Sequence, residues 1–330
     1  MGCSKAPSEP STPSVTPSDT AHEPLPETDH PTVKSFEPDP DALIISFHLK
    51  SDQRVAKIDT TSFSGQLSKE DLYSDYSLDC DGDGQFEKTN LHDSSECVYE
   101  QEGSHRLQIK GVLPRLLLSS ISDSVNIEQW GTIPWKSMAY MGSGCTHLTI
   151  SAKDTPNLSS VKSMRGMFKQ ATQFNDPIDH WDVSHVTDMN ELFFYAESFN
   201  QPLDSWNVSN VENMEKMFSH ATAFNAAIGK WNVSKVKNFS EMFSYATSFN
   251  QSIRNWRPGE ADMRKMFFHA ETFNHNLSHW SFKDKQLVGF FMGANSFKHE
   301  ATLEKIQNDI EDGSSDCYLV DQLFDDEDVD

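Results

Sequence analysis

A short acidic run is the part of this chain whose residue types and spacing best suit chemistry. Its acids alternate with other residues and a glycine takes the sixth position; the members are Asp79, Asp81, Asp83 and Gly84. Oxygen ligands at this spacing can wrap a hard cation such as Ca²⁺, with Glu87 as a further ligand. A complete calcium loop also needs a bidentate Glu at its twelfth position, which here is Asn90. Two interpretations stay open, a calcium site and a hairpin turn with acidic edges.

The cysteines suggest an exported protein. Cys80 and Cys97 flank the acidic run on segments expected to be strands, and a disulfide between them would contribute about 3 kcal/mol. Disulfides persist in oxidising compartments, so this pair fits export. We expect Cys145 to be a small core residue and assign no role to Cys317. The sequence shows neither a C-x-x-C pair nor the ligand spacing of a zinc site.

The sequence lacks the short motifs that mark common enzyme sites. It contains no H-E-x-x-H, G-x-S-x-G or P-loop run, and its 13 histidines are scattered. The 27 basic and 50 acidic residues give a net charge of −23, and such a surface repels nucleic acids and anionic membranes. No apolar stretch is long enough to span a bilayer. We therefore expect a protein that is not an enzyme, does not bind nucleic acid and has no cofactor other than the calcium considered above.

The acidic run lies in a segment with the pattern of β-strands. Within residues 41–120, strand-like stretches occupy 42–47 and 105–112, and a glycine-rich turn lies between them. The order of Tyr76, Asp79 and Asp81, followed by Tyr99 and Gly103, is similar to that of polycystic-kidney-disease-type (PKD-like) immunoglobulin domains. The resemblance implies a β-sandwich over residues 41–120.

The longest organised stretch is an internal repeat between Met164 and Phe297. Its period is about 25 residues, which is typical of proteins built from stacked units. Each unit begins with apolar residues at helical spacing and continues with a W-x-V pattern typical of a short strand. We expect these apolar residues to form the core, and the Asn after the second Phe of each unit to bond backbone groups of adjacent coils. The helical spacing is that of Met189, Leu192, Phe193 and Ala196.

These units resemble the BspA-like leucine-rich-repeat bacterial surface proteins, in the branch with the repeat M-x-x-M-F-x-x-A-x-x-F-N-x-x-[IL]-x-x-W-x-V-S-x-V. The resemblance covers about Ile127 to Phe297 and weakens at Trp256–Gly259, where the V-S-x-V element is lost. It implies an α/β solenoid of the leucine-rich-repeat type over residues 121–298. The expected fold class is α+β, an N-terminal immunoglobulin/PKD-like β-sandwich followed by this solenoid.

The two ends of the chain have their own patterns. Residues 1–40 are rich in Pro, Ser and Thr, which is typical of a disordered tether. Their start resembles the region around a bacterial lipobox, with Cys3 as the lipidated residue; an unmodified tail is the alternative, and N-myristoylation fails because position 6 is Ala6. In residues 299–330 we expect a capping helix and then an acidic tail. The helix is predicted by the spacing of Leu303, Ile306 and Ile310.

One column of the repeat has the residue types of a binding surface. Four successive members are aromatic or imidazole: Tyr195, His220, Tyr245 and His269. Such side chains suit contacts with proteins or glycans, whereas partial burial against the next coil is the alternative interpretation. A second column, on the expected strand, contains Asp182, Asn207 and Asn232.

These observations favour a non-enzymatic lipoprotein of the cell surface or outer membrane, anchored through Cys3, whose repeats bind extracellular or host proteins, with glycans as a further ligand class. The BspA-like resemblance implies this adhesive function. Two alternatives remain: a structural or scaffolding repeat protein of the cell envelope and, as the least favoured, a Ca²⁺-dependent enzyme.

Overall fold

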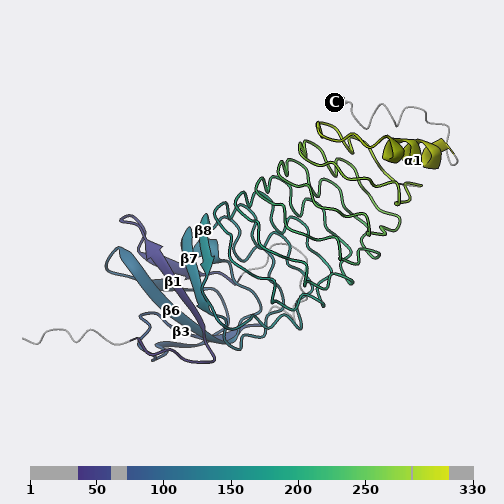
Figure 1. The fold of residues 1–330 in the computed structure, drawn as a ribbon. Coiled ribbons are helices and arrows are strands. Elements are labelled where there is room, and N and C mark those ends of the chain that lie inside the picture. Colours follow the sequence, from purple (N-terminus) through teal and green to yellow (C-terminus); the bar gives the residue numbers. More distant parts are fainter. Residues whose placement is uncertain (1–35, 61–72, 284, 312–330) are drawn as a thin grey trace, which may run out of the picture. The chain divides into compact units, whose positions relative to one another are not determined.

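The computed structural model describes residues 36–60, 73–283 and 285–311, which belong to one compact unit, Ser35–Asp330. Figure 1 shows a sheet in the N-terminal part of this unit, followed by a stack of coils. Cys3, Cys317 and the acidic tail lie outside the described residues, as does nearly all of the expected tether.

Most of the strands form one six-stranded sheet. Its order is β4-β3-β6-β1-β7-β8, and β1 pairs antiparallel with both β6 and β7. The last pair, β7–β8, is parallel. The strands are β1 (Leu43–Leu49), β3 (Asp75–Asp79), β4 (Lys88–Leu91), β6 (Gly103–Val112), β7 (Ser124–Gln129) and β8 (His147–Ile150).

A second, smaller sheet and one short helix complete this region. Strands β2 (Val55–Ile58) and β5 (Ser95–Val98) pair antiparallel, and the 3₁₀ helix η1 covers Leu118–Ser120. The prediction of an immunoglobulin/PKD-like sandwich was wrong, because the strands form one large mixed sheet and a separate two-stranded sheet. The large sheet also runs past residue 120 through β7 and β8. Alternating apolar residues predict where strands form, but they do not determine which strands pair.

The prediction of an α/β solenoid was also wrong. In the described residues between β8 and His299, the chain forms turns and isolated bridges, with neither a helix nor an extended strand. Adjacent coils are joined by single parallel bridges at equivalent positions. These bridges are Ser163↔Asp188, Asp188↔Asn213, Asn213↔Asn238, Asn238↔Asp262 and Asp262↔Gln286.

The backbone hydrogen bonds explain why the helical spacing misleads. The N–H groups of Leu192, Phe194 and Ala196 donate three residues back within their own coil, at 3.0–3.2 Å. The intervening N–H groups donate instead to carbonyls of the next coil, as in Glu191 to Glu215 (2.8 Å). An α-helix would use all of these donors within one coil and leave none to join the stack. A run of turns still buries the residues at helical spacing, Met189, Leu192, Phe193 and Ala196.

The expected core of the repeats is confirmed. The opening Met, the two Phe, the Ala and the Trp of the repeat units are buried, and equivalent Phe rings stack from coil to coil, such as Phe168 on Phe193 with centroids 5.4 Å apart. Four of these indoles donate into the preceding coil, for example Trp206 Nε1 to the Ile178 carbonyl at 3.0 Å. Because each coil covers its neighbour, the stack buries side chains that one coil could not bury alone.

The repeated Asn has the role expected of it. The Oδ1 atom of Asn175 accepts the N–H of Asn200 at 2.9 Å, and Asn200 in turn accepts from Asn225 at 2.8 Å. The series continues through Asn250 and Asn274 to the N–H of Lys298. These side chains therefore link five coil-to-coil steps, which confirms that they bond backbone groups of adjacent coils.

The stack ends at the only α-helix of the described residues, α1 (Glu300–Glu311), where the sequence predicts a capping helix. Ile306 is fully buried, and the side chains of Thr302 and Asp309 accept the backbone N–H groups of Leu277 (2.9 Å) and Phe282 (2.7 Å). These two side-chain bonds attach the helix to the last coil.

Candidate partner-binding face and acidic loop

The four aromatic and imidazole residues of the candidate binding column form one continuous stack, called here the aromatic ladder (Tyr195, His220, Tyr245 and His269). The centroid distances are 4.1 Å from Tyr195 to His220, 4.4 Å from His220 to Tyr245 and 4.9 Å from Tyr245 to His269. The rings lie within 17° of parallel, and all four side chains are partly exposed. The expected partial burial against the next coil is confirmed, because the ring faces cover one another. Part of each side chain still reaches solvent, and the binding function of the column stays a prediction.

The ladder side chains project outward because of an unusual backbone conformation. All four residues have positive φ, between 51° and 59°, a region that L-amino acids rarely adopt. The same column contains Gln170 (φ 59°) before the ladder and Gly293 (φ 69°) after it. At Gly293 an added Cβ would lie 2.5 Å from Nδ1 of His269, so the last imidazole packs directly on that backbone.

Two phenylalanines brace the ladder from one side. The ring of Phe194 lies edge-on to that of Tyr195, with centroids 4.6 Å apart, and the ring of Phe268 lies edge-on to that of His269, with centroids 4.5 Å apart. Lys169 and Lys265 lie over the faces of Phe194 and Phe268, at 5.1 and 5.2 Å from the ring centroids. These contacts hold the rings in place, so that binding through the ladder would order few additional side chains.

A column of alternating charge lies four residues before the ladder in each coil. Its members are Glu191, Lys216, Glu241 and Lys265, and all have positive φ. Lys216 pairs with Glu241 at 3.3 Å, and Glu191 pairs with Lys169 at 3.1 Å. The surface beside the ladder is therefore close to neutral, in contrast to the net charge of −23 for the whole chain. This column was not predicted from the sequence, although the sign of the charge changes between equivalent positions of successive repeats and could have revealed it.

The second column proposed from the sequence is also exposed, but its side chains form hydrogen bonds within their own turns. The side-chain oxygens of Asp182, Asn207 and Asn232 each accept the N–H two residues ahead, at 3.0–3.2 Å. Such bonds shape the turns between coils. The column does not stack as the ladder does.

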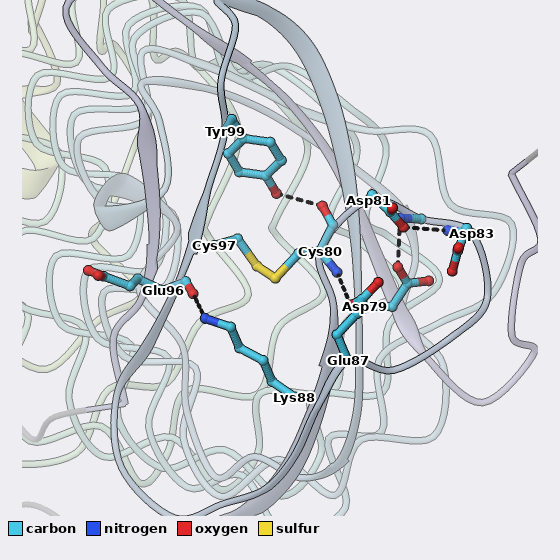
Figure 2. Close-up of a disulfide and its surroundings, with 10 residues drawn as sticks. Asp79, Cys80, Asp81, Asp83, Glu87, Lys88, Glu96, Cys97 and Tyr99 are labelled. Carbon is cyan, nitrogen blue, oxygen red and sulfur yellow. Dashed lines mark hydrogen bonds between the residues drawn. A yellow bond between two sulfur atoms is a disulfide. The ribbon is translucent and has the colours of Figure 1, made fainter. Parts of the chain in front are cut away.

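The structure brings the proposed calcium ligands together. Ligand atoms of Asp79, Asp81, Asp83 and Glu87 all lie within 4.8 Å of one another, and Figure 2 shows them at one end of the loop that follows β3. Asp79 is fully buried, with Oδ1 accepting the N–H of Gly82 (2.6 Å) and Oδ2 that of Gly84 (2.8 Å). The other three acids are partly or fully exposed.

The donor set fits a hard cation only in part. Four carboxylates at this separation suit Ca²⁺, which prefers six to eight oxygen ligands. Asp79 Oδ2 also accepts Nε2 of Gln108 at 2.8 Å, and Glu87 accepts the N–H of Cys80 at 3.0 Å. Asn90, at the twelfth position, lies in β4 with a positive φ. Both interpretations of the acidic run therefore remain predictions, since the same bonds would also stabilise a simple acidic turn.

The disulfide expected from the sequence is present. Cys80 and Cys97 are joined, with Cα atoms 5.6 Å apart, and the bond ties the acidic loop to β5 (Figure 2). The Tyr99 hydroxyl donates to the Cys80 carbonyl at 2.9 Å. Burial, together with Asp79 and the neighbouring acids, raises the pKa of Tyr99 well above its usual value. Cys145 is a free, buried thiol as expected, and burial raises its pKa to about 12.

Comparison with known proteins gives one family. The family described as "Mycoplasma protein of unknown function, DUF285" matches residues 136–256 and 203–305, which together cover just over half of the chain. No curated protein and no solved structure gives a significant match. None of the helices in the described residues is long and apolar enough to cross a membrane. The family match lies on the stacked coils and supports the repeat-family part of the BspA-like resemblance, but it does not reach the segment expected to be PKD-like. The chain therefore belongs to the DUF285 family of Mycoplasma-type repeat proteins.

Proposed function

We propose that this chain is a non-enzymatic cell-surface protein whose stacked coils bind extracellular partners through the aromatic ladder. The ladder carries the proposal, because it places four partly exposed aromatic or imidazole rings in one line across four coils. Tyrosine and similar amphipathic rings are enriched at interfaces, where they contribute large contact area with few rotatable bonds.

The remaining features are consistent with a protein that works outside the cytosol. The Cys80–Cys97 disulfide suits an oxidising compartment. Lipidation of Cys3 would attach the chain to the membrane, and the Pro-rich residues 1–40 would hold the coils away from it. Extracellular or host proteins are the proposed partners, with glycans as the second ligand class.

The test compares ladder variants of the full-length chain. The triple variant Tyr195→Gln, His220→Gln and Tyr245→Gln removes three rings but keeps a residue that the column already accepts at Gln170. Beads coated with each protein would be tested against a panel of purified extracellular-matrix proteins and mucin glycans. We expect the triple variant to lose at least tenfold in affinity for whichever probe the unmodified chain binds.

A matched control changes the other exposed column. The double variant Asn207→Ala and Asn232→Ala alters residues that bond only locally, and we expect it to bind as the unmodified chain does. Equal binding by all three proteins would contradict a role for the ladder in recognition.

A scaffolding function is the second candidate, because the same ring stacking also joins adjacent coils and thereby stabilises the array. It predicts that cells lacking the protein show envelope defects, and that the triple variant loses stability without any loss of partner binding. Deletion of the gene, followed by complementation with the triple variant, separates the two functions.

A further inference from the structure

The two histidines of the aromatic ladder are in an environment unlike that of a solvated imidazole. His220 lies between the faces of Tyr195 and Tyr245, and Phe194 meets its edge at 6.0 Å. His269 lies between Tyr245 and the backbone of Gly293. Within the described residues, the ring nitrogens of both histidines form neither a hydrogen bond nor an ion pair, whereas the ring nitrogens of His275 and His299 bond to backbone carbonyls.

The charged groups that act on His220 are both acidic. Glu241 and Glu197 both act on His220 and favour its protonated form. Lys216, four residues before His220, pairs with Glu241 at 3.3 Å. The remaining titratable side chains in the adjacent columns are Glu191, Tyr195 and Tyr245 around His220, and Glu241, Tyr245, Lys265 and Glu271 around His269.

Burial decides the balance at His220. Removal of the ring from water disfavours the imidazolium, and this effect lowers the pKa of His220 below its ordinary 6.5 despite the two glutamates. The unfolded chain therefore binds this proton at a higher pH than the folded chain does. It follows that the free energy of unfolding falls as the pH drops below about 6.5. The stack is thus adapted to neutral rings.

We propose that the aromatic ladder is an acid-responsive surface, in which proton uptake by His220 places a positive charge within a neutral strip of stacked rings and weakens binding of a partner that packs on the neutral ring faces. The consequence for binding rests on the proposed function, whereas the protonation of the stack does not. The chemistry needs only protons from solvent, each of which binds a free ring nitrogen.

The first experiment measures the stack itself by NMR on the full-length chain. Ring resonances of Tyr195, Tyr245, His220 and His269 would be followed from pH 7.5 to pH 4.5. We expect the tyrosine shifts to move together with His220, at a midpoint below that of the same histidine in the urea-unfolded chain. Tyrosine shifts that stay constant while His220 titrates, or a His220 midpoint at or above the unfolded value, would overturn the proposal.

Variants assign the effect to the imidazoles. His220→Tyr with His269→Tyr makes an all-tyrosine ladder, which should keep the stacking and which contains no imidazole. His220→Gln with His269→Gln serves as a second pair, since Gln170 already occupies this column. We expect both pairs to lose the pH-dependent tyrosine shifts. His180→Gln changes an exposed histidine beside Asp179 and should leave those shifts intact. Persistence of the shifts in both ladder pairs would exclude the mechanism.

The binding arm uses a matrix protein that the unmodified chain binds at pH 7.4. We expect affinity to fall at least fivefold at pH 5.5 for the unmodified chain and less than twofold for the all-tyrosine ladder. Equal loss in both proteins would contradict the inference. If no probe binds at either pH, the proposed function is what fails, and the ring titrations still decide whether the ladder responds to acid.

Discussion

At the scale of single residues, the stack depends on a backbone conformation that most amino acids disfavour. Residues with positive φ recur at two positions of each coil, represented by Glu191 and Tyr195, and most of them are not glycine. The left-handed region costs an L-residue about 1–2 kcal/mol. Because alternate N–H groups must turn toward the next coil, the fold imposes this conformation whatever the side chain is.

This strain predicts that glycine stabilises the protein at Gln170. The residue has φ 59° and an exposed side chain, and glycines stand at equivalent positions of the column, Gly144 and Gly293. Glycine avoids the left-handed penalty but loses more entropy on folding, so Gln170→Gly should raise the free energy of unfolding by about 0.5–1 kcal/mol in urea denaturation. The control Gln173→Gly, at an exposed position without positive φ, should lower it. A loss of stability in both variants would refute this account.

The acidic loop yields a second prediction at the residue scale. If the carboxylates hold Ca²⁺, then millimolar CaCl₂ raises the melting temperature of the full-length chain and EDTA reverses the increase, because a ligand that binds only the folded state stabilises it. Asp81→Asn with Asp83→Asn should abolish the increase, whereas the exposed Glu102→Gln should keep it. Asp79 is left unchanged because its oxygens bond the loop backbone. An unchanged melting temperature would favour the plain acidic turn.

At the scale of elements, the capping helix replaces the missing next coil. The helical spacing of Leu303 and Ile306 predicted α1, and the structure adds how it is attached, through side-chain oxygens that accept backbone N–H groups. Without such acceptors the last coil would hold buried donors without partners, which is costly.

Thr302 tests this attachment. It is fully buried, and Thr302→Val keeps its shape but removes the acceptor for the Leu277 N–H. We expect the free energy of unfolding to fall by about 1–3 kcal/mol, with faster hydrogen exchange at Leu277. The control Thr222→Val removes an exposed hydroxyl that donates to the Glu197 carbonyl and should cost less than about 0.5 kcal/mol. Equal costs for the two variants would show that the cap is not held in this way.

At the scale of the whole molecule, the proposal of a surface lipoprotein makes a direct prediction. In intact cells that express the full gene, external protease should cleave the stacked coils, and the N-terminal fragment should carry the mass of a lipid on Cys3. Cytosolic marker proteins must stay intact as the control. An unmodified fragment and protected coils would rule out the surface location and, with it, adhesion as the function.

The interior of the repeats could be predicted from the sequence, and so could several local features. The period, the buried Phe and Trp columns, the Asn series and the Cys80–Cys97 pair are all present. These properties follow from side-chain chemistry at regular spacing, because apolar residues that recur with one period must face one core. The four carboxylates of the acidic loop also meet, since a tight turn brings alternate side chains together.

The secondary structure of the coils and the geometry of the ladder were decided only by the tertiary structure. Apolar positions such as Met189 and Phe193 are buried equally well by a helix and by a run of turns. The backbone decides between them, because its alternate N–H groups bond to the next coil. The spacing of side chains in the sequence does not reveal where these N–H groups bond. The face-to-face stacking of Tyr195 and His220 has the same origin, because the sequence placed the two rings in one column and only the distance between coils brought them into contact.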